Sequence, residues 1–115
     1  MKKWNDIYKL PLHQDEYGYW VYDENNNFVF QFERIKDYNR NTVIDILNGL
    51  KEPTKPHSFT YEDGYIVMDG EREIILIRGW GNLTGTGAHN LPAEEAANVQ
   101  DTFAQWIIER LTKKD

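Results

Sequence analysis

Two Asp-Gly pairs constrain the fold of this chain more than any other feature of its sequence. They stand at 63–64 and 69–70, inside the stretch SFTYEDGYIVMDGEREIILIRG of residues 58–79. An Asp-Gly pair between alternating apolar residues is the strongest short-range signal of a β-hairpin, because both residues tolerate the positive φ angles of a two-residue turn. The stretch therefore predicts a three-stranded meander. Its last strand, EIILIRG, is apolar on both faces, which predicts a central or helix-covered position.

A second hairpin is predicted for residues 17–34, YGYWVYDENNNFVFQFER. Apolar residues alternate on both sides of the segment DENNN, whose residues tolerate turn conformations. Phe28, Phe30 and Phe32 stand two residues apart in this pattern. Since side chains two apart point to the same side of a strand, we expect all three phenylalanines on one buried face.

Two helices are predicted from apolar residues at helical spacing. The shorter spans 41–50, where Asn41 or Thr42 can cap the start and Pro53 prevents continuation. The longer spans 92–114. Leu91 occupies its expected cap position, where Ser or Asp caps better, and Asn90 is the alternative cap. The long helix carries one apolar stripe, which consists of Ala96, Val99, Phe103, Ile107 and Leu111 and is widened by Trp106.

Together these elements predict a single α+β domain over residues 1–115, in the order ββαβββα. The expected architecture is a mostly antiparallel five-stranded sheet with two helices on one face. A chain of 115 residues can bury one core without covalent cross-links. It contains no cysteine, which excludes disulfides, thiolate nucleophiles and cysteine-based zinc sites.

Net charge and hydropathy limit the classes of partner that this chain is expected to bind. The formal net charge is −6, spread along the chain, which disfavours binding to duplex nucleic acid because such proteins need a basic face. No apolar run follows the first lysines, and no stretch approaches the roughly 20 apolar residues of a membrane span. We therefore expect a cytoplasmic protein that contacts no membrane.

The segment RGWGNLTGTGAHNLP, residues 78–92, is the strongest candidate for a ligand site. A glycine-rich turn that leads into a helix can point several backbone N–H groups at a ligand. In this hypothesis Trp80 stacks on a ring, Arg78 pairs with a charge, and the remaining residues supply hydrogen bonds. The predicted ligand-binding residues are Arg78, Trp80, Gly81, Asn82, Thr84, Gly85, Thr86, Gly87, His89 and Asn90.

The alternative is that residues 78–90 only connect a strand to a helix. The segment matches no phosphate-binding loop pattern, and Glu94 and Glu95 at the start of the following helix would repel an anion. Its polar groups would then satisfy one another. A connection of this length is nevertheless uncommon in a compact domain unless it is functional, so both interpretations stay open.

Catalysis and metal binding have little support in the sequence. His13, His57 and His89 are far apart and lack metal-ligand spacing, so we expect neither a metal nor a cofactor. Ser58 is the only serine and lacks the surroundings of a nucleophile elbow. The adjacent carboxylate pairs at 15–16, 23–24 and 62–63 are typical of solvated turns. A non-enzymatic protein is therefore favoured, with an enzyme of unrecognised type as a remaining alternative.

Aromatic residues of the first hairpin form a further candidate surface. Tyr17, Tyr19, Trp20 and Tyr22 stand close together, and one face of their strand is expected to point away from the core. Exposed rings on an acidic protein suit a protein interface or a contact in a homo-oligomer. The equally weighted alternative is a second small core, formed where the segment WNDIYKLPL of residues 4–12 lies across the sheet.

The stretch IRGWGNLTGTGAHNLPAEEAANVQDTFAQWIIERL, residues 77–111, together with YGYWVYDENNNFVFQF upstream, resembles small uncharacterised proteins of bacteriophages and prophages. Those proteins carry a similar R-G-W-G-N-L-T-G segment before a helix with a Q-D-x-F-A-like core. The likeness covers most of the chain and implies no catalytic residue. It implies an accessory protein that acts by binding, as an inhibitor of host defence proteins or as a sponge for nucleotide signals.

These observations give two main hypotheses. In the first, the chain is a non-enzymatic anti-defence protein that sequesters a small polar or nucleotide-type ligand at residues 78–90. In the second, it is an inhibitor or subunit that binds a host or phage protein through its aromatic hairpin.

Overall fold

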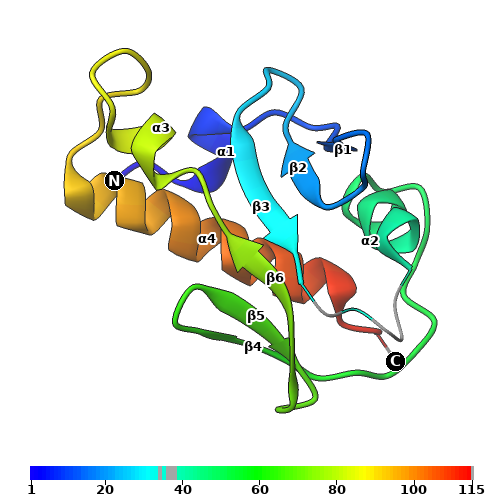
Figure 1. Cartoon of the computed structure of the whole chain (residues 1–115). Helices are drawn as coiled ribbons and strands as arrows, with labels where there is room; N and C mark the ends of the chain where they lie inside the picture. Colours follow the sequence, from blue (N-terminus) through cyan, green and yellow to red (C-terminus); the bar gives the residue numbers. More distant parts are fainter. Residues whose placement is uncertain (34, 36–38, 115) are drawn as a thin grey trace.

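An antiparallel sheet with helices packed on one side organises this chain (Figure 1). The computed structural model describes residues 1–33, 35 and 39–114. The sheet has the strand order β1-β2-β3-β6-β5-β4. In chain order the elements are α1 (Trp4–Ile7), β1 (His13–Gln14), β2 (Trp20–Tyr22), β3 (Phe28–Phe32), α2 (Arg40–Leu47), β4 (Phe59–Glu62), β5 (Tyr65–Met68), β6 (Arg72–Ile77), α3 (Trp80–Thr84) and α4 (Ala93–Leu111).

The structure confirms a compact α+β domain with an antiparallel sheet, but the predicted number of elements is wrong. The described residues form six strands and four helices rather than five strands and two helices. The additional strand β1 has only two residues, and the additional helices α1 and α3 have four and five. Elements this short show no hydrophobic periodicity, so a sequence pattern does not reveal them.

The predicted meander of residues 58–79 is present as β4, β5 and β6. Both Asp-Gly turns adopt the expected left-handed conformation, with φ of 53° and 85° at 63–64 and of 57° and 72° at 69–70. Strand β6 lies between β3 and β5, so it is central as expected. The register shifts where Ile66 pairs with Ile75 and Val67 pairs with Glu73, which leaves Ile74 as an extra residue and buries both Ile74 and Ile75.

The predicted hairpin of residues 17–34 forms β2 and β3, but the expectation for its phenylalanines is wrong in part. Phe30 and Phe32 are buried and face α4, as the 6.2 Å between the Phe30 and Phe103 ring centroids shows. Val21 pairs with Phe30 and Tyr22 pairs with Phe28, so Val29 is an extra residue in β3. This bulge turns Phe28 to the opposite face, where its ring stacks on Trp20.

Helix α4 covers the inner face of the sheet. In the view of Figure 1 it passes behind β3 and β6, and no described helix lies in front of these strands. The residues of its predicted stripe are all fully buried, and α1, α2 and α3 each contact α4. The ring centroids of Trp4 and Trp106 lie 4.3 Å apart, and those of Tyr8 and Phe103 lie 5.1 Å apart. Residues 4–12 therefore extend the main core beside α4 and do not form a second core on the outer face.

The helix ends differ from those predicted. Helix α2 begins at Arg40, because the Asn39 side chain accepts a hydrogen bond from the Asn41 N–H, and it ends at Leu47. Leu50 lies beyond this helix and is exposed. Helix α4 has Pro92 as its N-cap and no side-chain cap. Neither expected cap residue acts there, since Leu91 is buried and its N–H donates to the Leu83 carbonyl.

Candidate functional site

The segment 78–90 is folded back on itself. It is not an irregular connection, because residues 80–84 form helix α3. The N–H groups of Ala88 and Asn90 both donate to the Gly85 carbonyl, and the His89 N–H donates to the Asn82 carbonyl. The Gly85 N–H donates to Gly81, 2.7 Å away. These backbone amides are thus already satisfied within the protein.

Two of the predicted ligand-binding side chains also point inward. The Asn82 Nδ2 and the His89 Nε2 lie 2.8 and 2.9 Å from the same acceptor, the Oδ1 of buried Asn27. The Asn27 Nδ2 donates to a carboxylate oxygen of Asp23, which fixes the orientation of the amide. The His89 Nε2 must therefore carry a hydrogen and donate it to Asn27.

Asp23 is the centre of this buried polar network. Its carboxylate is fully buried and accepts hydrogen bonds from the backbone N–H groups of Lys9, Asn25 and Asn27 and from the Asn27 side chain. The network joins the N-terminal segment, the β2–β3 turn and the segment 78–90. Since a buried carboxylate is costly unless it is fully hydrogen-bonded, these contacts hold the three segments together. Sequence reasoning assigned Asp23 only to a solvated turn.

The other predicted ligand-binding residues lie near the surface. Trp80 is 44% exposed, and Gly81, Thr86, Gly87 and Asn90 are exposed. The Thr84 hydroxyl donates to the Trp80 carbonyl. Thr84 and Gly85 are half-buried. A ligand at residues 78–90 stays a prediction, for which Trp80 and the 86–88 turn are the accessible parts.

Arg78 is separated from this network and belongs to the outer face of the sheet. Its Nη1 donates to the Gln31 Oε1 at 2.6 Å, and its Cζ lies 5.3 Å from the centroid of the Phe28 ring. A guanidinium over an aromatic ring is attracted by the negative ring face. These two contacts hold the exposed guanidinium of Arg78 in one orientation.

Aromatic rings lie beside Arg78 and continue across the first strands. The Phe28 ring stacks on Trp20 at 5.0 Å and contacts Tyr22 at 5.5 Å, and Tyr22 stacks on His13 at 5.9 Å. Trp20 is 47% exposed. The first hairpin therefore presents a stack of rings that the inner core does not use.

The pairing of the strands places further side chains on this same face of the sheet. Trp20 pairs with Gln31, Gln31 pairs with Leu76, and Leu76 pairs with Tyr65. All of these side chains are half-buried or exposed, in contrast to the buried inner face. We name this surface the open face; its members are Trp20, Tyr22, Phe28, Gln31, Glu33, Glu62, Tyr65, Val67, Glu73, Leu76 and Arg78.

The charges of the open face are separated along the strands. Arg78 follows the C-terminal end of β6, next to the start of β3. Glu73 lies near the opposite end of β6, and Glu33 follows the other end of β3, where its carboxylate accepts from the Gln31 side chain. Among the described open-face residues, one end of the two central strands therefore carries the Arg78 guanidinium and the other end carries the two carboxylates.

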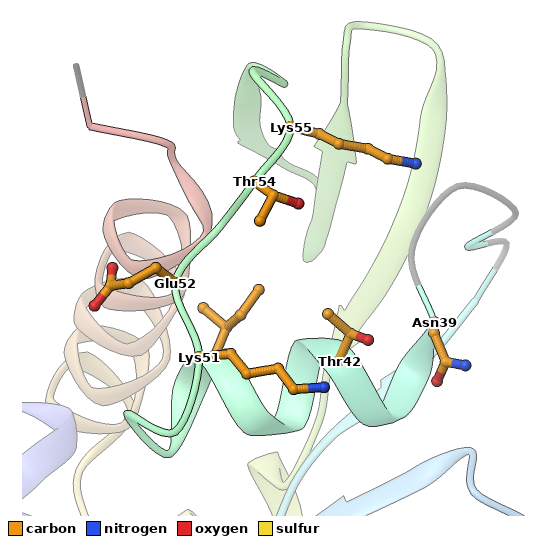
Figure 2. A pocket seen from close by; sticks show the side chains of 7 residues that line it. Asn39, Thr42, Lys51, Glu52, Thr54 and Lys55 are labelled. Atoms are coloured by element: carbon orange, nitrogen blue, oxygen red, sulfur yellow. The ribbon is translucent and has the colours of Figure 1, made fainter.

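A pocket of about 310 Å³ lies between α2 and residues 51–55 (Figure 2). Lys51 and Lys55 extend to the same side of this segment, opposite to Glu52. Thr42 and Thr54 contribute hydroxyl groups to the lining. The Lys51 ammonium already lies 3.4 Å from the Asp45 carboxylate, so the pocket is not an unpaired cationic site.

A shallower hollow of about 410 Å³ lies beside Trp4 and Trp106, with Asp101 and Glu109 on its rim. Neither this hollow nor the pocket beside α2 is lined by residues of the segment 78–90.

The three histidines lie in separate places. His13 stacks on Tyr22, His89 contacts Asn27, and the His57 Nδ1 lies 2.6 Å from the Asp69 carboxylate. The pKa of Asp69 is lowered, chiefly by the hydrogen bond from the Ser58 backbone and then by His57. Among the residues that the structure describes, no group of three or more possible ligands is positioned to hold a metal.

Comparison of the chain with protein-family models, with curated proteins and with solved structures finds no match. Across residues 1–33, 35 and 39–114, none of the helices combines the length and the apolar composition needed to cross a bilayer.

Proposed function

We propose that this chain is a non-enzymatic binding protein that contacts a protein partner through the open face. The observation that carries the proposal is the stack formed by Trp20, Phe28 and Arg78 on the outer side of the sheet. No described helix covers it, and Trp20 is 47% exposed. Tryptophan, tyrosine and arginine are the residues that most often dominate the binding energy of protein interfaces.

The arrangement of these side chains favours binding because they lose little conformational entropy when a partner binds. Stacking holds Trp20 against Phe28, and the hydrogen bond to Gln31 fixes Arg78. Ordering a mobile side chain at an interface costs about 0.5–1.5 kcal/mol, so side chains that are already fixed keep more of their contact energy. The two pockets described above are not lined by residues of the open face, and a surface without a concave site suits a protein partner better than a small ligand.

The double variant Trp20→Ala/Tyr22→Ala tests the proposal. Tagged protein is used to capture binding proteins from a lysate, and retained chains are compared between the wild type and the variant. We expect the variant to lose at least about 90% of a specifically retained protein, which corresponds to about 1.4 kcal/mol. Tyr17→Ala is the matched control, because Tyr17 is 72% exposed and has no described contact with the ring stack. Equal retention by the double variant and the control would contradict the proposal.

The second candidate function is the sequestration of a small polar or nucleotide-type ligand at residues 78–90. One observation favours it: the Trp80 indole is 44% exposed at the start of α3, although its segment is well ordered by internal hydrogen bonds. In this function Trp80 stacks on a base or ring, and the exposed 86–88 turn supplies backbone groups. Asn82 and His89 then act only by holding the segment in place.

A further inference from the structure

We infer that the partner of the open face is a second copy of this chain, packed sheet to sheet about a twofold axis that crosses the strands. The inference rests on the proposed function, since it uses the same surface. The resulting dimer has four layers, with the two sheets inside and the helices of each copy outside. Its basis is the distribution of charge and apolar groups on the open face.

The charges of the open face are self-complementary. Glu73 lies on β6 and Arg78 directly follows its C-terminal end; because Ile74 is an extra residue in a bulge, the two are about four strand positions and therefore about 13 Å apart. A twofold axis relates contacts reciprocally, so that a group on one copy meets its complement on the other and the reverse. An axis halfway along β3 and β6 places each Arg78 over the acidic end of the other copy, where Glu73 and Glu33 lie.

The residues along this axis form a row that can pack against the same row of the second copy. Cross-strand pairing aligns Trp20, Gln31, Leu76 and Tyr65 across four strands. The row joins two aromatic rings and an aliphatic side chain to one amide that can both donate and accept. It ends at Glu62 on the edge strand β4; the two copies of this exposed carboxylate meet at the rim of the dimer, where water screens their repulsion. Neither charge of the Arg78–Glu73 pair lies on the axis, so like charges do not meet at the centre.

The size of the face sets the expected strength of the dimer. Six strands about 4.8 Å apart, of two to six residues and about four on average, span on the order of 24 by 13 Å. That area of about 300 Å² per copy is well below the roughly 800 Å² that each partner of a standard specific interface buries, which is typical of weak, transient contacts. The net charge of −6 on each copy opposes association further. We therefore expect a reversible dimer with a dissociation constant in the range of about 1–100 µM.

Sedimentation velocity of the full chain tests the inference. Samples from about 1 to 500 µM are compared at about 0.15 M NaCl, where screening limits the repulsion between the two net charges. We expect the mass to rise from the 13.6 kDa of one chain toward twice that value as concentration increases. Arg78→Glu alone and Glu33→Arg/Glu73→Arg together should each weaken the dimer at least tenfold. A mixture of these two variants should form a heterodimer again.

Control variants distinguish the effect of open-face contacts on dimerisation from general effects of net charge and of misfolding. Glu109→Arg changes the charge at an exposed site on α4 by two units, as many as Arg78→Glu with opposite sign and half as many as the double variant, and it should dimerise at least as well as the wild type. Circular dichroism establishes that each variant is folded. Wild-type protein that stays at the mass of one chain at about 500 µM overturns the inference. A dimer that survives both charge variants and Trp20→Ala also overturns it. If the protein is monomeric but Trp20→Ala/Tyr22→Ala abolishes capture of another protein, the inference fails and the proposed function stands.

Discussion

At the scale of single residues, Tyr8 shows how burial controls a titration. Its side chain is only 2% exposed, and its hydroxyl has no hydrogen-bond partner among the described residues. Burial raises the pKa of Tyr8 well above its usual value of 10.0, and the nearby negative charge of Asp23 raises this pKa further. The folded protein therefore keeps Tyr8 protonated at a pH where the unfolded chain ionises.

We expect Tyr8→Phe to increase the unfolding free energy by about 1 kcal/mol at pH 7, because a buried hydroxyl without a partner is removed. Above pH 10 the unfolded chain of the wild type loses the Tyr8 proton first, so the wild type loses about 1.4 kcal/mol per pH unit that the variant does not lose. Urea unfolding at pH 7, 10 and 11 measures both effects. Tyr17→Phe, at a 72% exposed position, should follow the wild type. Parallel pH curves for Tyr8→Phe and the wild type would contradict this prediction.

Phe28 is the residue of the first hairpin whose face of the sheet was predicted wrongly from the spacing of residues. The alternation of three phenylalanines correctly places Phe30 and Phe32 in the core. One extra residue in β3, Val29, reverses the alternation and puts Phe28 on the open face. A bulge depends on the pairing of two strands, so the spacing of residues within one strand does not reveal it.

At the scale of elements, the junction of β6 and α3 depends on Gly79. This residue has a φ of 95°, and a Cβ atom added to it would lie 2.2 Å from the Phe28 carbonyl oxygen. Glycine is therefore required both by the left-handed conformation and by the close approach of β3.

Gly79→Ala should lower the unfolding free energy by at least about 3 kcal/mol, since backbone strain adds to a clash with backbone that cannot move freely. Chemical denaturation of purified protein measures the change. Gly81→Ala is the matched control within α3, because nothing lies within 4 Å of its added Cβ and alanine favours a helix. It should be neutral or stabilising by up to about 1 kcal/mol. Similar losses of unfolding free energy for the two variants would show that the close approach of Gly79 to the Phe28 carbonyl does not determine the stability of this junction.

At the scale of the whole molecule, the two candidate binding surfaces lie on different parts of the fold. The open face belongs to the outer side of the sheet, whereas Trp80 begins a helix that contacts α4. Arg78 belongs to both surfaces, but a variant of Trp20 or of Trp80 should leave the other surface intact, which allows the two functions to be tested independently.

A thermal-shift panel of linear and cyclic nucleotides tests the small-ligand function. A ligand at one hundred times its Kd should stabilise the protein by about 2.7 kcal/mol, which raises the Tm by roughly 10–20 °C for a domain of this size. Trp80→Ala should abolish the shift, and Trp20→Ala should leave it unchanged. Absence of any shift across the panel, or a shift that Trp80→Ala preserves, would remove this candidate.

The sequence by itself determined the meander, the first hairpin and the long amphipathic helix. The conformation of the Asp-Gly turns and the buried stripe of α4 depend on residues that are one to four positions apart in the chain. The spacing of residues in the sequence therefore predicts both features directly. Only the tertiary structure decided what the glycine-rich segment does with its polar groups. Asn82 and His89 meet Asn27, which lies 55 and 62 residues earlier in the chain. It also decided which face of the sheet stays uncovered, because the other described helices all contact α4, which covers the inner face. These outcomes depend on packing between distant segments, and no spacing of neighbouring residues encodes them.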